Sequence, residues 1–456
     1  MTDNPDNIFD DLDNLDKVDD HYAEHLAQLD ESQDVLSSQD IVNKEGVLLC
    51  KKGMHINSKT AKRLLQHKLS QPLEESILLS DSIDYAMLFK KLHQQLDSYQ
   101  DCRSIHDTMA FDAVAKKTFL FTRLNPVIIQ KLTVINEQMP EQLDKGVFCA
   151  WLSLLIAVEM GLDEDIQQQA YLAGLLHDIG FIHISPDILN KKGVLTAEEW
   201  RAIQSHVVIG KLMLEQYKDI IPDEVSRAVL EHHERCDGSG YPAHKNDTTL
   251  GLIGQIVGVA DSIHAIRTKQ FVRHGRNMVD LLPYLQMNAK TYFYDVYKAL
   301  NSILKRSGLK MSMPQNADIS QFANNLYVRN QALSKAIGAL QDSNILDMSA
   351  EFSSNKDHSL YKICMHVLTM STESGLVREE MHEWLQQMAS HPDPEAVAEL
   401  NEIELMLNEL HWQLKNACRG CDESLVKSSA SAGAQFALRE AYNTVGLCLG
   451  ELEDKI

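Results

Sequence analysis

The chain has 456 residues, 44% of them hydrophobic, and a formal net charge of −22 at pH 7. This length allows two or three domains with buried cores. An excess of acidic residues argues against general nucleic-acid binding, because the phosphate backbone repels it. No apolar run is long enough to span a bilayer, and the acidic N-terminus lacks the basic region of a signal peptide. We therefore expect a cytoplasmic protein with no membrane span.

The first forty residues are strongly acidic. They contain thirteen acidic residues, one lysine and few large apolar side chains. Such a composition cannot bury enough apolar surface to fold, so we expect an acidic disordered tail over residues 1–36. Its simplest role is to keep the chain soluble, and docking to a partner is the alternative.

A small α/β module is expected over residues 37–82. The segment 40–49 alternates in polarity and is interrupted by Lys44-Glu45-Gly46, which indicates a short hairpin. An amphipathic helix should begin at Asn57-Ser58, and residues 73–79 can return as a strand. The alternation of strand and helix patterns defines the module.

Helical patterns dominate the rest of the chain, which predicts a mainly α fold. We expect a helical connector over residues 83–130, an HD-type helical bundle that carries the chemical motifs over 131–310, and a C-terminal helical domain over 316–456. Apolar residues from Leu400 to Leu414 recur every three or four positions. This stripe indicates the core of a helical bundle, and a dimerisation or partner-binding helix is the alternative.

Histidine and aspartate residues recur at the ends or edges of four predicted helices. His177-Asp178 follows an apolar helix, and His206 lies on a helix that begins with the capping box Thr196 to Glu199. His232-His233 ends a helix for which Asp223 is the expected N-cap. Two adjacent histidines on an apolar helix are costly to bury unless they bind something.

The spacing of these residues makes them one set. His177, His206, His233 and Asp261 are separated by 29, 27 and 28 residues, and each gap fits one helix plus one connection. Helices of one bundle can therefore bring the side chains to a single point. Imidazole and carboxylate ligands suit iron, manganese or zinc. Four histidines and two aspartates exceed the needs of one ion, so we expect two metals bridged by a shared carboxylate.

A glycine-rich loop follows the histidine pair. The segment Asp237-Gly238-Ser239-Gly240-Tyr241-Pro242 combines two flexible glycines with a proline that fixes φ. Tyr241 adds a ring and a hydroxyl group. Alone this would be an ordinary loop. Directly after metal-binding histidines it is predicted to face the substrate.

These motifs resemble the HD-GYP family, a branch of the HD metal-dependent phosphohydrolases. The similarity covers about 130 residues clearly, from His177-Asp178-Ile179-Gly180 through the loop at 237–242 to Val259-Ala260-Asp261. It implies an all-helical domain that binds two or three transition metals and hydrolyses cyclic di-GMP. It also implies the following metal ligands: Glu141, His177, Asp178, His206, His232, His233 and Asp261. The substrate-binding residues implied are Gly238, Gly240, Tyr241, Pro242 and Arg273.

The chain departs from the family pattern at several positions. Phe181 replaces a lysine, Lys145 a histidine, Gln270 an arginine and His264 an aspartate, and His244-Lys245 replaces Gly-Leu. The loss of the histidine at 145 argues against a third metal. Phosphate contacts from cations contribute about 1.5–3 kcal/mol each, so two losses would cost roughly a hundredfold in binding or rate. Nearby candidates to compensate are Lys145, Arg267, Lys269, Arg273 and Arg276.

Two functions follow from this pattern. The first is a metal-dependent phosphodiesterase in which a bridging hydroxide attacks phosphorus and cyclic di-GMP is cut to pGpG or GMP, with Asp178 as the key catalytic residue. The alternative is a weak or inactive domain that binds metal or nucleotide as a signalling module. The replacements at 181 and 270 motivate this second interpretation. A related nucleotide as substrate is a further alternative.

Overall fold

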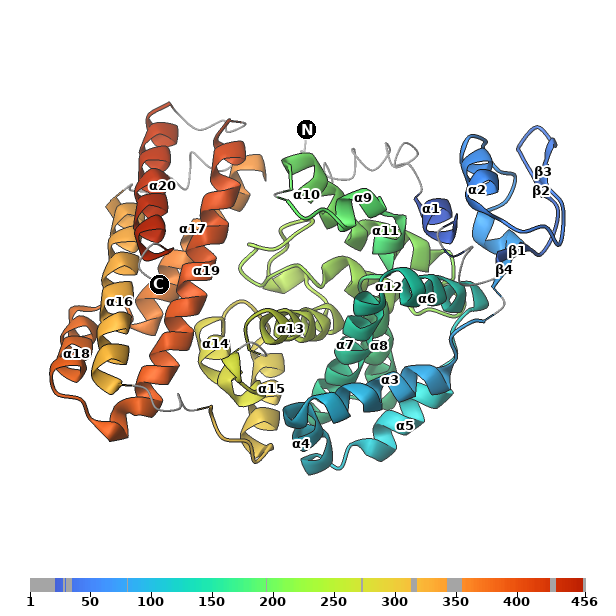
Figure 1. Cartoon of the computed structure of the whole chain (residues 1–456). Coiled ribbons are helices and arrows are strands. Elements are labelled where there is room, and N and C mark those ends of the chain that lie inside the picture. The colour runs from blue at the N-terminus through green and yellow to red at the C-terminus, as the bar shows by residue number, and fades with distance from the viewer. Residues whose placement is uncertain are drawn as a thin grey trace. The chain divides into compact units, whose positions relative to one another are not determined.

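The computed structural model describes residues 21–27, 29, 35–79, 81–193, 195–271, 274–312, 318–342, 355–426 and 432–453. The described chain is mainly helical, as predicted (Figure 1). It forms two compact units. The first comprises the residues up to 234 together with 241–243 and 250–265, and the second comprises 235–240, 244–249 and the residues from 266 onward. None of the described helices is long and apolar enough to cross a membrane.

The first unit begins with the small module and continues into the helices that surround the motifs. Its elements are α1 (Tyr22–Ala27), β1 (Val35–Ser37), β2 (Ile41–Val42), β3 (Leu48–Cys50), α2 (Ser58–Leu65), η2 (Leu73–Ser76), β4 (Ile77–Leu79), α3 (Tyr85–Ser98), α4 (Gln100–Thr108), α5 (Asp112–Phe121), α6 (Pro126–Gln138), α7 (Pro140–Glu159), α8 (Glu164–Leu176), η3 (Ile179–His183), α9 (Pro186–Leu189), α10 (Ala197–Gln204), α11 (His206–Glu215), α12 (Asp223–Glu231) and α13 (Leu252–Ile266).

The small module contains two antiparallel strand pairs. The predicted hairpin is confirmed, because β2 pairs with β3, and the predicted helix start is confirmed by the Asn57 side chain, which accepts a hydrogen bond from Thr60 N at 3.0 Å. The strand expected over 73–79 is wrong in its first half. A 3-10 turn follows Pro72, and only β4 pairs with β1. Proline favours the start of a helical turn, which explains the difference.

Part of the segment that was expected to be disordered is a helix. In α1 the side chains of Tyr22 and Leu26 are fully buried. Tyr22 Oη donates a 2.8 Å hydrogen bond to Gln130 Oε1, and His25 Nε2 lies 3.0 Å from the Ile184 carbonyl. The expectation of disorder is therefore wrong for α1, because a few apolar residues at helical spacing anchor an otherwise acidic segment. Residues 1–20 lie outside the described part of the chain.

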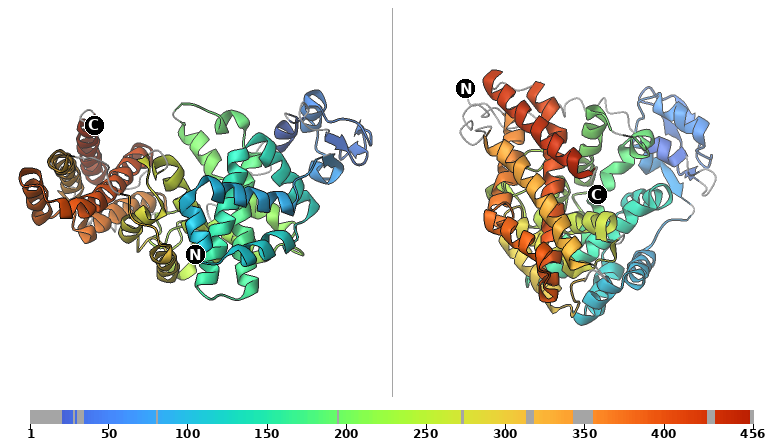
Figure 2. Two further views of the ribbon diagram at one scale, coloured as in Figure 1. Left: turned by 60° about the horizontal axis from the view of Figure 1, so that its bottom comes forward. Right: turned by 60° about the vertical axis from the view of Figure 1, so that its left-hand side comes forward.

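Helices α7 and α8 pack side by side and form the centre of the first unit (Figures 1 and 2). Their backbones approach closely at Gly146, where an added Cβ would lie 2.8 Å from the Leu175 carbonyl oxygen. No side chain fits at that distance, so Gly146 permits the close approach. Lys145 and Cys149 are thereby held next to the end of α8.

The second unit consists of short helices followed by a bundle. Its elements are η4 (Asp247–Thr249), the π-helical turn η5 (Arg267–Phe271), η7 (Met278–Asp280), α14 (Leu281–Met287), α15 (Tyr294–Arg306), α16 (Ile319–Asp342), α17 (Asn355–Ser374), α18 (Glu379–Ser390), η9 (Pro394–Ala396), α19 (Val397–Val426) and α20 (Ala432–Glu453).

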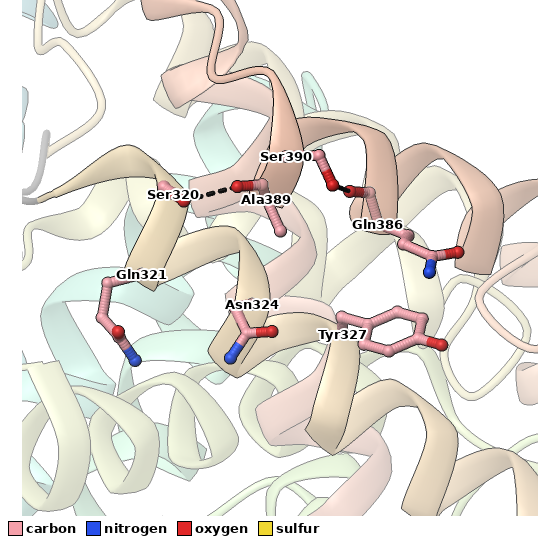
Figure 3. A pocket seen from close by; sticks show the side chains of 7 residues that line it. All are labelled: Ser320, Gln321, Asn324, Tyr327, Gln386, Ala389 and Ser390. Atoms are coloured by element: carbon pink, nitrogen blue, oxygen red, sulfur yellow. Dashed lines mark hydrogen bonds between the residues drawn. The ribbon is translucent and has the colours of Figure 1, made fainter.

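The apolar stripe of residues 400–414 lies on α19. Leu400, Leu407, Leu410 and Leu414 are fully buried, and α16 and α20 pack against the same helix. The stripe is thus the core of the bundle, as its first interpretation predicted. A polar pocket of about 330 Å³ lies between α16 and α18 (Figure 3). Its lining contains no charged side chain, so it has no cation to offer to a phosphate.

Candidate metal centre

The His177-Asp178 pair stands where α8 ends and η3 begins. His177 is the C-cap of α8, and both side chains are buried. Gly180 lies two residues after Asp178, in η3. An added Cβ at Gly180 would lie 2.0 Å from the His206 carbonyl oxygen, so Gly180 allows the segment with His206 to approach this turn.

His206 is the first residue of α11. The predicted capping box is confirmed, because Thr196 and Glu199 bond to each other's backbone nitrogen atoms. The helix that was expected to run on from it is interrupted at Ser205, between α10 and α11. The interruption turns the 1%-exposed His206 side chain toward Asp178, at 3.3 Å between Nε2 and Oδ1.

His232 and His233 follow the last turn of α12. His232 is its C-cap. The N-cap of α12 is Pro222, so the expectation that Asp223 is the N-cap is wrong by one residue. Asp223 lies in the first turn, where its negative charge still favours the helix. Asp261 lies on α13 and is 5% exposed.

The structure brings six of the seven predicted metal ligands into two groups of atoms. Within each group the ligand atoms lie within 4.8 Å of one another. The first group is Asp178, His206, His232 and His233, and the second is Cys149, His177 and Asp261. The two groups adjoin, since His177 Nε2 lies 3.2 Å from Asp178 Oδ2.

Three of the histidines are oriented by backbone carbonyl groups of the helix that precedes each of them. Their Nδ1 atoms lie 2.7–2.8 Å from the carbonyl oxygens three residues earlier, of Gly174, Ile203 and Val229 for His177, His206 and His232. A carbonyl only accepts, so Nδ1 must donate. In the neutral ring Nε2 then carries a lone pair, which is the arrangement of a metal-ligating imidazole.

One oxygen atom of Asp178 needs a cation. Oδ1 is buried and accepts no hydrogen bond, although His206 Nε2 and His232 Nε2 lie 3.3 and 3.8 Å from it. Neutral rings that carry their proton on Nδ1 cannot donate to this oxygen. A buried carboxylate oxygen facing lone pairs is costly, so the arrangement fits a bound metal ion.

Burial and neighbouring charges set the protonation states of these groups. Burial, together with the nearby His177 and His206, holds the pKa of His232 well below its ordinary value, so this ring is neutral. Burial alone would raise the pKa of Asp178, but His177 and Lys145 hold it well below its usual range. Burial opposes the charge of His177, yet the neighbouring Asp178 raises its pKa to about 9.

Lys145 occupies the boundary of the second group. Its Nζ lies 2.7 Å from Asp178 Oδ2 and 2.6 Å from Asp261 Oδ1. Burial would lower the pKa of this ammonium group, but the two carboxylates outweigh burial and raise it. Lys145 was considered as a phosphate-binding replacement, and the structure places its charge on the two aspartates instead.

Glu141 and Cys149 lie one helical turn before and after Lys145 on α7. Glu141 is exposed and belongs to neither group of ligand atoms, so its role as a ligand stays a prediction. Cys149 was not predicted, yet it is fully buried beside His177 and Asp261. A signal was present, since residues 141, 145 and 149 share one face at a spacing of four.

Two aromatic rings cover the histidines. Phe181 stacks on His206 with ring centroids 4.2 Å apart, so the residue that replaces the family's lysine packs against a ligand. Tyr241 stacks on His233 with centroids 4.6 Å apart, and its backbone nitrogen donates to the His233 carbonyl at 3.1 Å. Both contacts restrict the rotation of the imidazole rings. His264, in place of an aspartate, packs against Phe148.

The remaining predicted substrate-binding residues are divided between the units. Tyr241 and Pro242 belong to the first, and the buried Gly238 and Gly240 belong to the second. Arg273 lies outside the described residues. Three contacts in the second unit were not predicted. His366 Nδ1 lies 2.7 Å from Asp237 Oδ2. Arg276 pairs with Glu404 and donates a hydrogen bond to Asn401. These contacts engage Arg276, one of the proposed compensating cations.

Comparison with known proteins supports the assignment of this region. Residues 124–296 match the profile of the HD domain. This segment is therefore similar to an HD domain, in agreement with the resemblance to HD metal-dependent phosphohydrolases that the motifs indicate.

Several curated relatives share this part of the chain. A "Cyclic di-GMP phosphodiesterase" of Thermotoga maritima is 29% identical over 242 residues, which are 50% of this chain and 62% of that protein. A "3'3'-cGAMP-specific phosphodiesterase 1" of Vibrio cholerae is 36% identical over 24% of this chain and 25% of its own length. A "Cyclic di-GMP phosphodiesterase" of Pseudomonas aeruginosa is 34% identical over 29% and 32%, respectively. The chain spans less than two thirds of each relative.

Proposed function

We propose that this protein is a metal-dependent phosphodiesterase that hydrolyses cyclic di-GMP to pGpG or GMP. The observation that carries the proposal is the first ligand group, where His206 and His232 present Nε2 lone pairs toward a buried oxygen of Asp178 that no hydrogen bond satisfies. The names of the relatives, which are phosphodiesterases of cyclic di-GMP or of cGAMP, support the substrate class.

A divalent transition metal fits this group. Imidazole nitrogen atoms with one carboxylate suit iron or manganese, and zinc is the alternative. When bound, such an ion would offset negative charge on a phosphoryl group and supply a nucleophilic water at neutral pH. The sequence leads us to expect two metals. Cys149, His177 and Asp261 are the candidate ligands of a second ion, but Lys145 already contacts Asp261.

The chain's own residues set up this environment. Lys145 keeps the carboxylates of Asp178 and Asp261 ionised, so both are acceptors or ligands at neutral pH. Phe181 and Tyr241 hold the rings of His206 and His233 in place. The ligand side chains are mostly buried, and electrostatic interactions are stronger where water is excluded.

The substrate loop remains part of the proposal. Gly238, Gly240, Tyr241 and Pro242 are proposed to receive the nucleotide, because a loop with two buried glycines directly follows the metal-binding histidines. Arg273 is proposed as a phosphate contact and Glu141 as an additional ligand, on the resemblance alone.

The test is turnover by protein loaded with manganese or iron, with cyclic di-GMP and 3'3'-cGAMP followed by chromatography. Asp178→Ala should abolish hydrolysis. Asp144→Ala is the matched control, because Asp144 is an acid on α7 that pairs with Lys91 away from the ligand groups, and it should keep activity. Hydrolysis that survives in Asp178→Ala would contradict the proposal. Tight nucleotide binding without turnover in the wild type would favour the signalling module instead.

A further inference from the structure

The most unusual group in the centre is the ammonium of Lys145. It contacts two buried aspartates that belong to different ligand groups, Asp178 through Oδ2 and Asp261 through Oδ1. Only 19% of its side chain is exposed. The neighbouring Gly146 allows α7 to lie against the backbone of α8, so the short distances follow from helix packing and not from a freely moving surface side chain.

The two ligand groups differ in what they already contain. In the first group, Asp178 Oδ1 faces the lone pairs of His206 and His232, and no hydrogen bond satisfies it. In the second group, Asp261 Oδ1 accepts no hydrogen bond either, but Lys145 Nζ forms an ion pair with it at 2.6 Å. His177 Nε2 lies 3.7 Å from the same Asp261 oxygen, so the ammonium stands among the atoms that a second metal would need.

The net charge of the centre distinguishes between one bound metal ion and two. With the imidazole rings counted as neutral, the two aspartates contribute two negative charges and Lys145 contributes one positive charge. One divalent ion brings the sum to a single positive charge. A second ion would bring it to three positive charges within a few ångströms, in a buried site where repulsion between like charges is strong.

We infer that this chain binds one divalent metal, at Asp178, His206, His232 and His233, and that the ammonium group of Lys145 takes the place of a second metal. The inference rests on the metal-binding part of the proposed function and not on the identity of the substrate. An ammonium group has three N–H donors. One donates to Asp178 Oδ2, and Nζ also pairs with Asp261 Oδ1. A remaining N–H group can donate to a phosphoryl oxygen, so the second site has a fixed charge that chelators cannot remove.

The experiment measures bound manganese per chain, by mass spectrometry after loading with excess Mn²⁺ and gel filtration, with electron paramagnetic resonance on the same samples. Wild type should hold about one ion with an uncoupled signal. Lys145→Met should hold about two ions with the broadened signal of a coupled pair. Lys145→Arg keeps the charge and should stay at about one. Lys91→Met is the control, because it removes a cation that pairs with Asp144 on the same helix.

Two ions in the wild type would overturn the inference, as would a single ion in folded Lys145→Met. If Lys145→Met does not fold, Asp261→Asn decides. The count should stay at about one if Lys145 replaces the second metal, and it should fall from two to one if Asp261 holds an ion. Turnover is assayed separately. One bound ion without hydrolysis would contradict the proposed phosphodiesterase activity and leave the inference about Lys145 standing. Hydrolysis with two bound ions would support the activity and contradict the inference.

Discussion

Two buried carboxylates, Asp178 in the metal centre and Glu409 in the C-terminal bundle, behave in opposite ways. Asp178 has Lys145 and His177 beside it, and its pKa lies well below the usual range despite burial. Glu409 is 3% exposed and accepts hydrogen bonds from the neutral amides of Gln413 and Asn288. Burial raises its pKa to about 7. Cations keep a buried acid ionised, while neutral donors only limit the cost of burying it.

The surroundings of Asp178 and Glu409 distinguish a candidate binding site from a structural polar contact. The centre retains ionised acids, and its buried atoms His177 Nε2, Asp178 Oδ1 and Asp261 Oδ1 make no hydrogen bond. Around Glu409, in contrast, neutral amides of the bundle donate to the acid and satisfy it internally. Burial of an acid is therefore weak evidence of function, whereas burial next to a cation and to imidazole lone pairs is strong evidence.

Asp178→Asn should have the largest effect, because it removes the charge that the first ligand group shares. Loss of even an outer partner of a metal ligand costs roughly 10–100-fold in affinity, so we expect manganese affinity to fall by about 100-fold or more. Isothermal titration with Mn²⁺ measures it. Unchanged affinity would mean that Asp178 is structural, like Glu409.

Glu409→Gln should make the bundle more stable at alkaline pH. In the folded protein the pKa of Glu409 is about 7, above its ordinary value near 4.5. The folded state therefore retains a proton that the unfolded chain releases, and wild-type stability declines as the pH rises from about 4.5 to 7.

Glutamine carries no such charge. The free energy of unfolding of the variant should therefore exceed that of the wild type by about 1–3 kcal/mol at pH 8 and by little at pH 4. Thermal unfolding at several pH values measures this difference. Equal unfolding temperatures for the two proteins at pH 8 would show that Glu409 is not buried in the way described. Metal binding should not change.

Phe181→Ala should have a smaller effect on the metal centre. The stacked pair with His206 stabilises by about 0.5–1.5 kcal/mol, so we expect metal affinity to fall roughly 2–10-fold. Phe181→Leu keeps apolar volume without the ring and serves as the control. A Phe181→Lys variant with higher turnover would support the view that a phosphate contact has been lost here.

His366→Ala should have the smallest effect. It removes the partner of Asp237, with which His366 makes a 2.7 Å contact in the second unit. A partly exposed ion pair contributes at most about 1 kcal/mol, so we expect a slight loss of thermal stability and an unchanged manganese count. A changed count would show that this loop contact influences the metal centre.

The sequence predicted well which side chains come together, for a physical reason. Each of the residues His177, His206, His232 and Asp261 lies at a helix end or on a helix edge that local patterns reveal, and the near-equal spacing indicates one bundle. The spacing of Lys145 and Cys149 puts them on one face of α7, but their positions beside the ligand groups could not be predicted from it. They depend on the close approach of α7 to α8 at Gly146, a contact between segments about thirty residues apart that no local pattern records.

Dependence on contacts between distant segments also explains the other differences between the expected and the observed structure. The break between α10 and α11 at Ser205 places His206, but the apolar pattern runs through it without interruption. The helix α1 depends on contacts with Gln130 and Ile184, more than a hundred residues away. Local composition predicted a tail because it contains no information about such distant partners.

The carbonyl groups that hold the imidazoles have one more consequence. Gly174, Ile203 and Val229 lie in the last turns of α8, α10 and α12. The C-terminus of a helix carries a partial negative charge from its aligned peptide dipoles, so three such ends converge on the centre. The backbone alone therefore attracts cations and repels a phosphate diester. An anionic ligand at this centre therefore depends on positive charge held by side chains such as Lys145 or by a bound metal ion.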